Sequence, residues 1–203
     1  VTLAAANVSF SSLELLDSAG FTLTLQGATV YNFSALTSVG LTTIVGDVTA
    51  NTITGTQGAD KISGSSANDL LDGAGGADTL IGGAGADALT GGLGDDVFLS
   101  GGGDLSGDAL NGGDGSDTLR FTSAVTLAAA GLSLTGVETL DMAGFALAVQ
   151  GTLPLNLSGL VLLNRGAITG DTLANTILGT ESADLLNGGT GDDAVNFNGD
   201  LTF

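Results

Sequence analysis

Large apolar residues recur at every ninth position between residues 55 and 99. Written in nines, this stretch reads GTQGADKIS, GSSANDLLD, GAGGADTLI, GGAGADALT and GGLGDDVFL. The eighth place of each nonapeptide is apolar and is occupied by Ile62, Leu71, Leu80, Leu89 and Phe98. Its two neighbours are expected to point the other way, because side chains alternate along a strand. Each nonapeptide therefore predicts a strand too short to stand alone, which stacks on its copies into a parallel sheet with one buried apolar row.

The first six residues of each nonapeptide predict a turn. Glycine stands at the first place throughout and at the fourth place in four of the five, where it permits positive φ and leaves carbonyl oxygens unshielded. The sixth place is always acidic and is occupied by Asp60, Asp69, Asp78, Asp87 and Asp96. Like charges stacked at this spacing repel one another unless a cation lies between them. Carboxylate and carbonyl oxygens in a flexible turn suit Ca²⁺ better than Mg²⁺, so the turns predict calcium sites.

The nonapeptides resemble the calcium-binding repeat of the RTX (repeat-in-toxin) family, G-G-x-G-x-D-x-U-x, where U is a large apolar residue. The best matches are GGAGADALT, GGLGDDVFL, GGDGSDTLR and GGTGDDAVN, at residues 82–90, 91–99, 112–120 and 188–196. The resemblance implies a parallel β-roll with two nonapeptides per coil and with calcium held between turns 18 residues apart. Such sites would join Asp60 with Asp78, Asp69 with Asp87, and Asp78 with Asp96.

The same frame of nines extends beyond this stretch on both sides. It begins at GDVTANTIT (46–54), and it resumes after a three-residue interruption, SGG, as GDLSGDALN and GGDGSDTLR (103–120). We expect this insertion to bulge out and to leave the stack intact, so that Asp87 faces Asp108 and Asp96 faces Asp117. A second run of three nonapeptides covers residues 170–196.

Two sixth places hold Asn instead of Asp. Asn51 and Asn175 offer only a neutral oxygen, so their sites are expected to be weak or empty. Four of the acidic sixth places, Asp60, Asp69, Asp108 and Asp184, lie in turns with fewer glycines. The full set of predicted calcium ligands is Asp60, Asp69, Asp78, Asp87, Asp96, Asp108, Asp117, Asp184 and Asp193.

The chain also repeats itself at an offset of 124 residues. VTLAAA at the start returns at Val125, LELLDSAGFTLTLQG returns as VETLDMAGFALAVQG, and GDVTANTITGTQGAD returns as GDTLANTILGTESAD. The repeated segments outside the nines alternate Thr, Val, Ile and Leu with small polar residues, which indicates strands of a sheet or of longer solenoid coils. We interpret the chain as tandem modules: 1–124 (β-rich flank 1–45, nonapeptides 46–120), 125–200 (flank 125–169, nonapeptides 170–196), and the start of a third at 201–203.

Charge and composition narrow the choice of partners. The 203 residues carry a formal net charge of −19, from 22 acidic and three basic residues, which would repel nucleic acid. An anionic membrane surface would be repelled as well unless calcium first neutralised the charge. No apolar run approaches the ~18 residues of a membrane span, so we expect no direct membrane insertion. The chain has no Cys, and calcium can replace disulfides as the staple of a secreted protein.

Catalytic constellations are scarce in this sequence. Without His or Cys, it lacks the usual general base and the best nucleophile. Glu14 with Asp17, and Glu138 with Asp141, form E-x-x-D pairs of the kind that glycoside hydrolysis uses. We interpret them as structural pairs that recur because the module recurs. The G-x-G pieces recur every nine residues without a following helix, so they do not indicate nucleotide binding.

Together these patterns predict an extracellular, calcium-binding structural repeat protein that is not an enzyme. Its low Lys content, absent Cys and Thr-, Ala- and Gly-rich strands resemble bacterial surface-layer proteins with RTX repeats, so we expect a calcium-dependent β-solenoid of a surface layer or surface filament. Two alternatives stay open, namely the stalk of a large RTX adhesin and the secretion and folding carrier region of a secreted RTX enzyme. The expected partners are calcium and neighbouring copies or modules, without nucleic acid.

Overall fold

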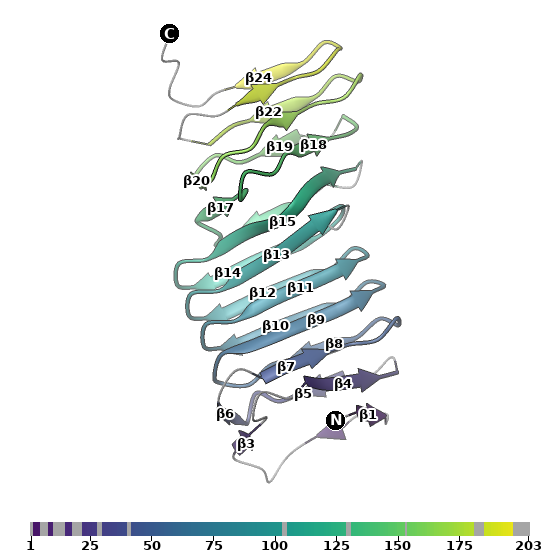
Figure 1. The fold of residues 1–203 in the computed structure, drawn as a ribbon, viewed down its shortest axis with the longest axis vertical. Helices are drawn as coiled ribbons and strands as arrows, with labels where there is room; N and C mark the ends of the chain where they lie inside the picture. Colours follow the sequence, from purple (N-terminus) through teal and green to yellow (C-terminus); the bar gives the residue numbers. More distant parts are fainter. Residues whose placement is uncertain are drawn as a thin grey trace.

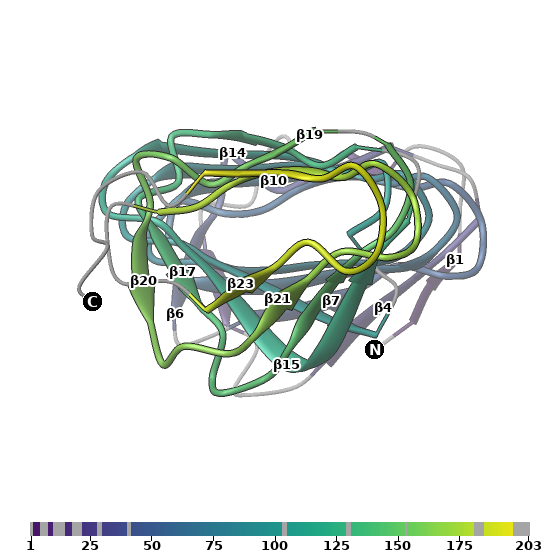
Figure 2. The ribbon, with the colours of Figure 1, turned by 90° about the horizontal axis from the view of Figure 1, so that it is seen from above.

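The chain winds into a stack of parallel coils. The computed structural model describes residues 2–4, 8–9, 15–17, 22–27, 30–39, 42–102, 105–128, 131–152, 154–180 and 185–196. Every regular element in these segments is a strand, and every strand pair is parallel. Strands from successive coils lie one above the other along the long axis (Figure 1), and from above the coils overlay as a flattened ring (Figure 2). The predicted all-β solenoid is therefore confirmed.

One large sheet runs along the whole stack. It has 12 strands, and its main path follows the order β1-β4-β7-β9-β11-β13-β15-β18-β21-β23, with β17 paired to β15 and to β20. Its strands are β1 (Thr2–Ala4), β4 (Thr22–Gln26), β7 (Thr42–Val45), β9 (Asp60–Ser66), β11 (Thr79–Ala84), β13 (Val97–Gly102), β15 (Thr118–Leu127), β17 (Thr139–Asp141), β18 (Leu147–Val149), β20 (Val161–Leu163), β21 (Ile168–Thr169) and β23 (Leu186–Asn187).

The remaining strands form the other sides of the coils. A seven-stranded sheet contains β16 (Ser133–Thr135), β14 (Ala109–Asp114), β12 (Ala88–Leu93), β10 (Leu70–Gly75), β8 (Thr52–Thr54), β5 (Val30–Asn32) and β2 (Val8–Ser9). A three-stranded sheet contains β19 (Pro154–Asn156), β22 (Thr176–Leu178) and β24 (Ala194–Asn196). A two-stranded sheet contains β3 (Leu15–Asp17) and β6 (Thr37–Val39).

The nonapeptide coils are built as their period predicts. Leu80 pairs with Ile62 in the large sheet, and Leu71 pairs with Leu89 on the opposite side, so one coil takes 18 residues and two nonapeptides. The eighth-place side chains form one buried row on each side, and Phe98 is only 1% exposed. Since the glycine-rich turns contribute no large side chains, this double row is the core of the region.

The three-residue insertion lengthens one coil without breaking the stack. Val97 pairs with Thr118, and Ala88 pairs with Ala109, so both sides keep their register across a 21-residue interval. The pairing of β13 with β15 shifts locally between Ser100 and Gly102. Leu105, just after the insertion, is buried in the core. The prediction of an intact stack is confirmed, but the expected outward bulge is wrong, because the inserted residues lie within β13, where Ser100 is buried and pairs with Phe121.

The flanks are longer coils of the same solenoid. Thr2 pairs with Thr24, and Val125 pairs with Leu147, so these coils take 22 residues. They have a third strand, because the long strand β15 pairs with β17 through its first half and with β18 through its second. The flanks are thus solenoid coils, and the predicted module boundary at 124/125 falls inside β15. Among the described residues, no helix has the length and apolar character needed to span a bilayer.

Candidate functional site

The sixth-place residues of the nonapeptides stack into two columns. Strands of successive nonapeptides alternate between the two main sheets, so consecutive turns lie at opposite edges of the coils. We call them the first column (Asp60, Asp78, Asp96 and Asp117) and the second column (Asn51, Asp69, Asp87 and Asp108). All eight side chains are buried. Apart from the Asn51 position, each column therefore places one acidic group per coil inside the edge of the stack, where burial disfavours charge.

From Asp69 onward, one oxygen of each carboxylate links its coil to the preceding coil. Asp78 Oδ1 accepts a hydrogen bond from the Asp60 backbone N–H at 2.7 Å, and Asp87 Oδ1 accepts one from Asp69 at 2.8 Å. The bond is kept across the longer coil, where Asp117 Oδ1 accepts the Asp96 N–H at 2.8 Å. The same contact joins Asp78 to Asp96, and Asp87 to Asp108. The structure thus brings together all five acid pairs that the sequence frame predicted.

The second oxygen of most of these carboxylates has no hydrogen-bond partner among the described residues. This buried, unpaired atom is Oδ2 in Asp69, Asp78, Asp87, Asp96 and Asp117. A buried acceptor without a partner costs about 1–3 kcal/mol, and more when it is charged. Native proteins keep such groups only where something else satisfies them, for example a bound ion. The repetition of the same atom in five turns indicates a repeated ligand.

Burial also shifts the acidity of these carboxyls. Desolvation raises the pKa of Asp78 to about 8, and the neighbouring charges of Asp96 and Asp60 raise it further against the lowering hydrogen bond from Asp60. Desolvation likewise raises the pKa values of Asp69 and Asp96 to about 6. A cation between consecutive turns would reverse this preference, because it stabilises the ionised form.

The first-place glycines leave room for the carboxylates. A Cβ built on Gly73 would overlap the Oδ2 of Asp78 and would meet the carbonyl oxygen of Gly91 in the next coil. The same two kinds of oxygen converge at the first-place glycines Gly64 and Gly91. Carboxylate and backbone carbonyl oxygens thus meet at Gly64, Gly73 and Gly91, and an all-oxygen donor set is the one that calcium prefers.

Positive φ angles distinguish two kinds of turn. At the second and fourth places, Gly83 and Gly85 have φ of 101° and 147°, which suits glycine. In the turn that precedes Asp69, Ser65 and Ala67 adopt φ of 92° and 84° and so keep the same backbone without glycine. Asp69 therefore lies in the same kind of turn as the acids of the glycine-rich nonapeptides.

The turn that ends at Asp60 has the other conformation. Neither Thr56 nor Gly58 has positive φ there. The Oδ2 of Asp60 accepts hydrogen bonds from the Thr56 backbone N–H at 2.6 Å and from its hydroxyl at 2.9 Å. The Oδ2 of Asp60 is thus bound within its own turn, unlike the Oδ2 atoms of the later coils.

The two Asn residues close their turns with hydrogen bonds. The amide oxygen of Asn51 accepts the Asp47 backbone N–H at 2.9 Å, and its Nδ2 donates to the Gly27 carbonyl at 3.2 Å. The Gly27 N–H donates in turn to Asp47, and together with Thr49 it lowers the pKa of Asp47 to about 2. The amide thus bridges two coils without an ion, which supports the expectation of weak or empty sites.

Asn175 repeats this arrangement 124 residues later. Its amide oxygen accepts the Asp171 N–H at 2.8 Å, and its Nδ2 donates to the Gly151 carbonyl at 2.7 Å. The next sixth-place acid on this side, Asp193, accepts the Asn175 N–H at 2.9 Å and is partly exposed. The predicted ligand Asp184 and the predicted module start at 201–203 lie outside the described residues.

The carboxylates come in pairs, not in larger clusters. No group of three or more His, Cys, Asp or Glu side chains that could hold a metal ion occurs in the described part of the chain. An ion between two coils would therefore take two carboxylates and complete its shell with backbone carbonyls, as the hard-cation chemistry of calcium allows.

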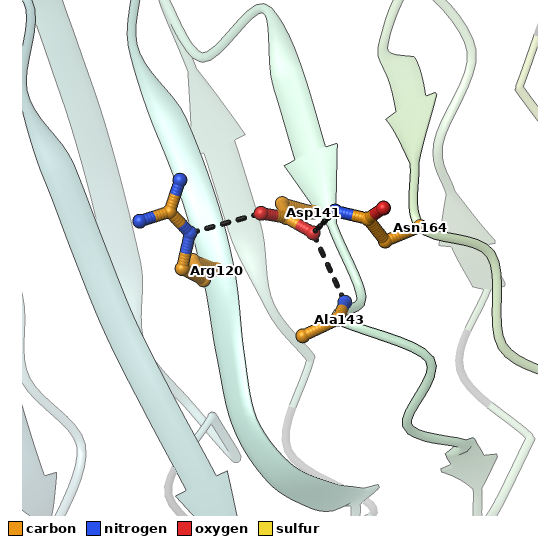
Figure 3. A network of polar contacts seen from close by, with 4 residues as sticks. All are labelled: Arg120, Asp141, Ala143 and Asn164. Atoms are coloured by element: carbon orange, nitrogen blue, oxygen red, sulfur yellow. Dashed lines mark hydrogen bonds and ion pairs between the residues drawn. The ribbon is translucent and has the colours of Figure 1, made fainter.

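The E-x-x-D pair of the second flank separates into two roles. Glu138 joins the first column, because its Oε2 accepts the Asp117 backbone N–H at 2.8 Å. Asp141 instead accepts hydrogen bonds from Arg120 Nε at 2.9 Å, from Asn164 Nδ2 at 2.8 Å and from the Ala143 N–H (Figure 3). Burial opposes ionisation of Asp141, but these donors together lower its pKa.

Sequence reasoning missed the place of Glu138 in the column. The available signal was an interval, because Glu138 follows Asp117 by 21 residues, as Asp117 follows Asp96. The equivalent Glu14 of the first flank lies outside the described residues.

A family model confirms what the turns contain. The model of the RTX calcium-binding nonapeptide repeat matches four segments, residues 45–80, 72–104, 106–120 and 169–200, which together cover more than half of the chain. Comparison with curated proteins and with solved structures gave no significant match. The matched segments contain both columns of buried carboxylates. The chain therefore belongs to the RTX calcium-binding nonapeptide repeat family, and its turns form a calcium-binding β-solenoid.

Proposed function

We propose that the chain is a structural, non-catalytic part of an extracellular assembly, a bacterial surface layer or surface filament, and that calcium holds its coils in register. The observation that carries the proposal is the row of buried Oδ2 atoms without hydrogen-bond partners among the described residues. Such a row is unfavourable by itself and becomes favourable when each oxygen binds a cation. Calcium then has a structural role in the fold, and no catalytic role is required of it.

The proposed ligands are the nine sixth-place acids of the sequence frame. Between two coils, Asp78 and Asp96 would each provide carboxylate oxygen, and carbonyls such as that of Gly91 would complete the shell. The ion supplies charge neutralisation, and the chain supplies the position of the oxygens. Since a preformed site does not exist in the unfolded chain, the free energy of calcium binding adds to the free energy of folding.

An extracellular location fits the balance of charge and calcium. Proteins with RTX repeats are typically secreted by bacteria, and weak calcium sites fill at extracellular concentrations of about 0.1–1 mM. A net charge of −19 keeps the calcium-free chain dispersed, and binding of several ions reduces that charge. Calcium would thus promote both coil formation and packing against neighbouring copies. The absence of His and Cys from the sequence supports a non-catalytic role.

The proposal is tested by following structure and assembly while calcium is varied. We expect circular dichroism to show loss of β-structure in chelator, recovery on addition of millimolar calcium, and little recovery with equal magnesium. Sedimentation velocity in the same buffers should show association only with calcium. Spectra that are identical with and without calcium would contradict the calcium-dependent fold. A calcium-folded chain that stays monomeric at high concentration would contradict the assembly role alone.

A further inference from the structure

The first column continues past the last nonapeptide into the second flank. The Asp117 N–H donates to Glu138 Oε2 at 2.8 Å, and the Asp96 N–H donates to Asp117 Oδ1 at the same distance. The strand register agrees, because Thr118 pairs with Thr139 and so sets Asp117 opposite Glu138. Glu138 therefore has the same hydrogen-bond relation to Asp117 that Asp117 has to Asp96.

A backbone oxygen repeats the same equivalence independently of the carboxylate. A Cβ built on Gly91 would meet the Oδ2 of Asp96 and the carbonyl oxygen of Gly112. A Cβ built on Gly112 would meet the Oδ2 of Asp117 and the carbonyl oxygen of Gly136. The Gly136 carbonyl thus stands in the flank where a first-place glycine carbonyl stands between nonapeptides.

The length of the Glu side chain matches the length of its turn. From Gly112 to Asp117 the nonapeptide turn takes six residues, whereas the flank turn from Gly136 to Glu138 takes three. Asn111 pairs with Thr135, so the two turns leave their strands at equivalent positions in successive coils. The flank turn is thus three residues shorter, and its acid has one more methylene than Asp.

A buried carboxylate oxygen that could bind an ion lies in the last nonapeptide turn. Asp117 is 0% exposed, and its Oδ2 has no hydrogen-bond partner among the described residues. It lies in the turn that faces Glu138 and the Gly136 carbonyl. The second column has no such continuation, because Ala109 pairs with Ser133 and the residue opposite Asp108 is Leu132. The acid is therefore specific to the first column.

We propose that Glu138 is a calcium ligand, and that one ion binds between the last nonapeptide turn and the flank turn, outside the repeat motif. The ion would take carboxylate oxygen from Asp117 and Glu138 and carbonyl oxygen from Gly136. This inference rests on the proposed calcium-dependent fold and adds one site to it. Its consequence is that an ion fastens the nonapeptide region to the flank.

The test compares two substitutions that each remove one negative charge. Glu138→Gln keeps the size of the side chain and loses the ligand charge, whereas Asp114→Asn alters an exposed acid in the same nonapeptide as Asp117. Calcium is titrated into the full chain by isothermal calorimetry. We expect Glu138→Gln to bind one ion fewer than wild type, or to bind that ion about tenfold or more weakly. Asp114→Asn should bind as wild type does.

Each outcome of this titration is informative. If wild type binds calcium and Glu138→Gln matches it in number and affinity, the inference is wrong and the proposed function stands. If wild type binds no calcium, both are wrong. If Glu138→Gln does not fold, anomalous scattering from calcium-soaked crystals of wild type decides: a peak between Asp117 and Glu138 supports the site, and its absence there beside peaks at other turns overturns it.

Discussion

The 18-residue nonapeptide coils and the longer flank coils stack on one axis but hold together differently. In the nonapeptide region, each strand from β8 to β14 contributes one large apolar side chain to the interior, and buried carboxylates face one another from coil to coil. In the first flank, Tyr31, Phe33 and Leu36 fill a wider interior. The flank turns close on themselves, since Asn32 Oδ1 accepts both the N–H and the hydroxyl of Ser34.

This difference shows which part of the stack depends on an ion. The second flank repeats the closed turn at Asn156 and Ser158, and it balances the carboxylate of Asp141 with Arg120 and Asn164. These described flank side chains are thus satisfied by the chain itself, whereas the Oδ2 atoms of the nonapeptide carboxylates are not. We infer that flanks fold with little help from calcium and provide ends on which the nonapeptide coils form.

The largest expected effect is a regional loss of structure on chelation. With calcium at about 100 times its dissociation constant, each ion adds about 2.7 kcal/mol to the coils it joins. Removal of calcium should therefore deprotect amides in residues 60–120 far more than amides in β17 to β21. Hydrogen exchange with mass spectrometry measures this difference peptide by peptide. Equal deprotection of both regions would mean that the comparison is wrong and that the stack unfolds as one unit.

The next effect concerns two glycines of one strand. Gly73→Ala places a methyl group on the Asp78 carboxylate and on the carbonyl of the next coil, whereas Gly75→Ala meets only the flexible end of Gln57 at 3.2 Å. We expect Gly73→Ala to lower the free energy of unfolding by about 1–3 kcal/mol in calcium. Gly75→Ala should cost clearly less. Denaturant titrations of both variants in calcium give the two values. Equal losses would contradict the close approach of the Asp78 carboxylate and the Gly91 carbonyl to Gly73.

In the calcium-free protein, the stability of the nonapeptide region and that of the second flank should depend on pH in opposite directions. Asp69, Asp78 and Asp96 have folded-state pKa values raised by burial above 3.8, so protons favour their folded form. Stability should be highest near pH 4 and should fall as pH rises through about 6 and 8. The lowered pKa of Asp141 has the opposite sign, so its contribution is lost only as pH falls below about 4. Thermal unfolding in chelator between pH 4 and 9 measures the trend.

The smallest effect is expected at Asn51, in the nonapeptide that follows the first flank. Asn51→Asp removes the donor to the Gly27 carbonyl, which should cost about 0.5–1.5 kcal/mol without calcium. With calcium the new carboxylate can bind an ion, so this cost should shrink. Asn51→Ala loses this donor and also the oxygen that accepts the Asp47 N–H, and it offers no ligand, so its cost should not depend on calcium. Melting curves of both variants, with and without calcium, show whether Asp behaves differently from Ala.

The period of nine was sufficient to predict the core and the acid pairs. A strict repeat fixes the register of neighbouring coils, so the positions of Leu80 opposite Ile62 and of Asp78 opposite Asp60 follow from spacing alone. The insertion did not spoil this inference, because it changes the length of one coil and leaves its neighbours aligned. The coil character of the flanks was only one of two readings, because their strands are irregularly spaced.

The glycine content of each turn was a less informative guide to its conformation. It placed Asp60 with Asp69, but the structure separates them. Stacking against neighbouring coils holds Ser65 and Ala67 in the positive-φ region that sequence reasoning reserves for glycine. Thr56, which local sequence does not mark, instead closes its turn on Asp60 through two hydrogen bonds. Such choices depend on contacts between coils, and a single repeat does not contain them.

Because one nonapeptide makes half a coil, an even number of nonapeptides completes whole coils and an odd number does not. Eight nonapeptides separate the two flanks, which is a whole number of coils, and Figure 2 shows β6, β17 and β20 on the same side of the axis. The run at 170–196 holds three, an odd number, so a flank of the same kind that followed it would project from the opposite side. Gain or loss of a single nonapeptide therefore rotates everything beyond it by half a revolution. The number of nonapeptides between two flanks therefore sets the direction, around the axis of the stack, in which the second flank projects.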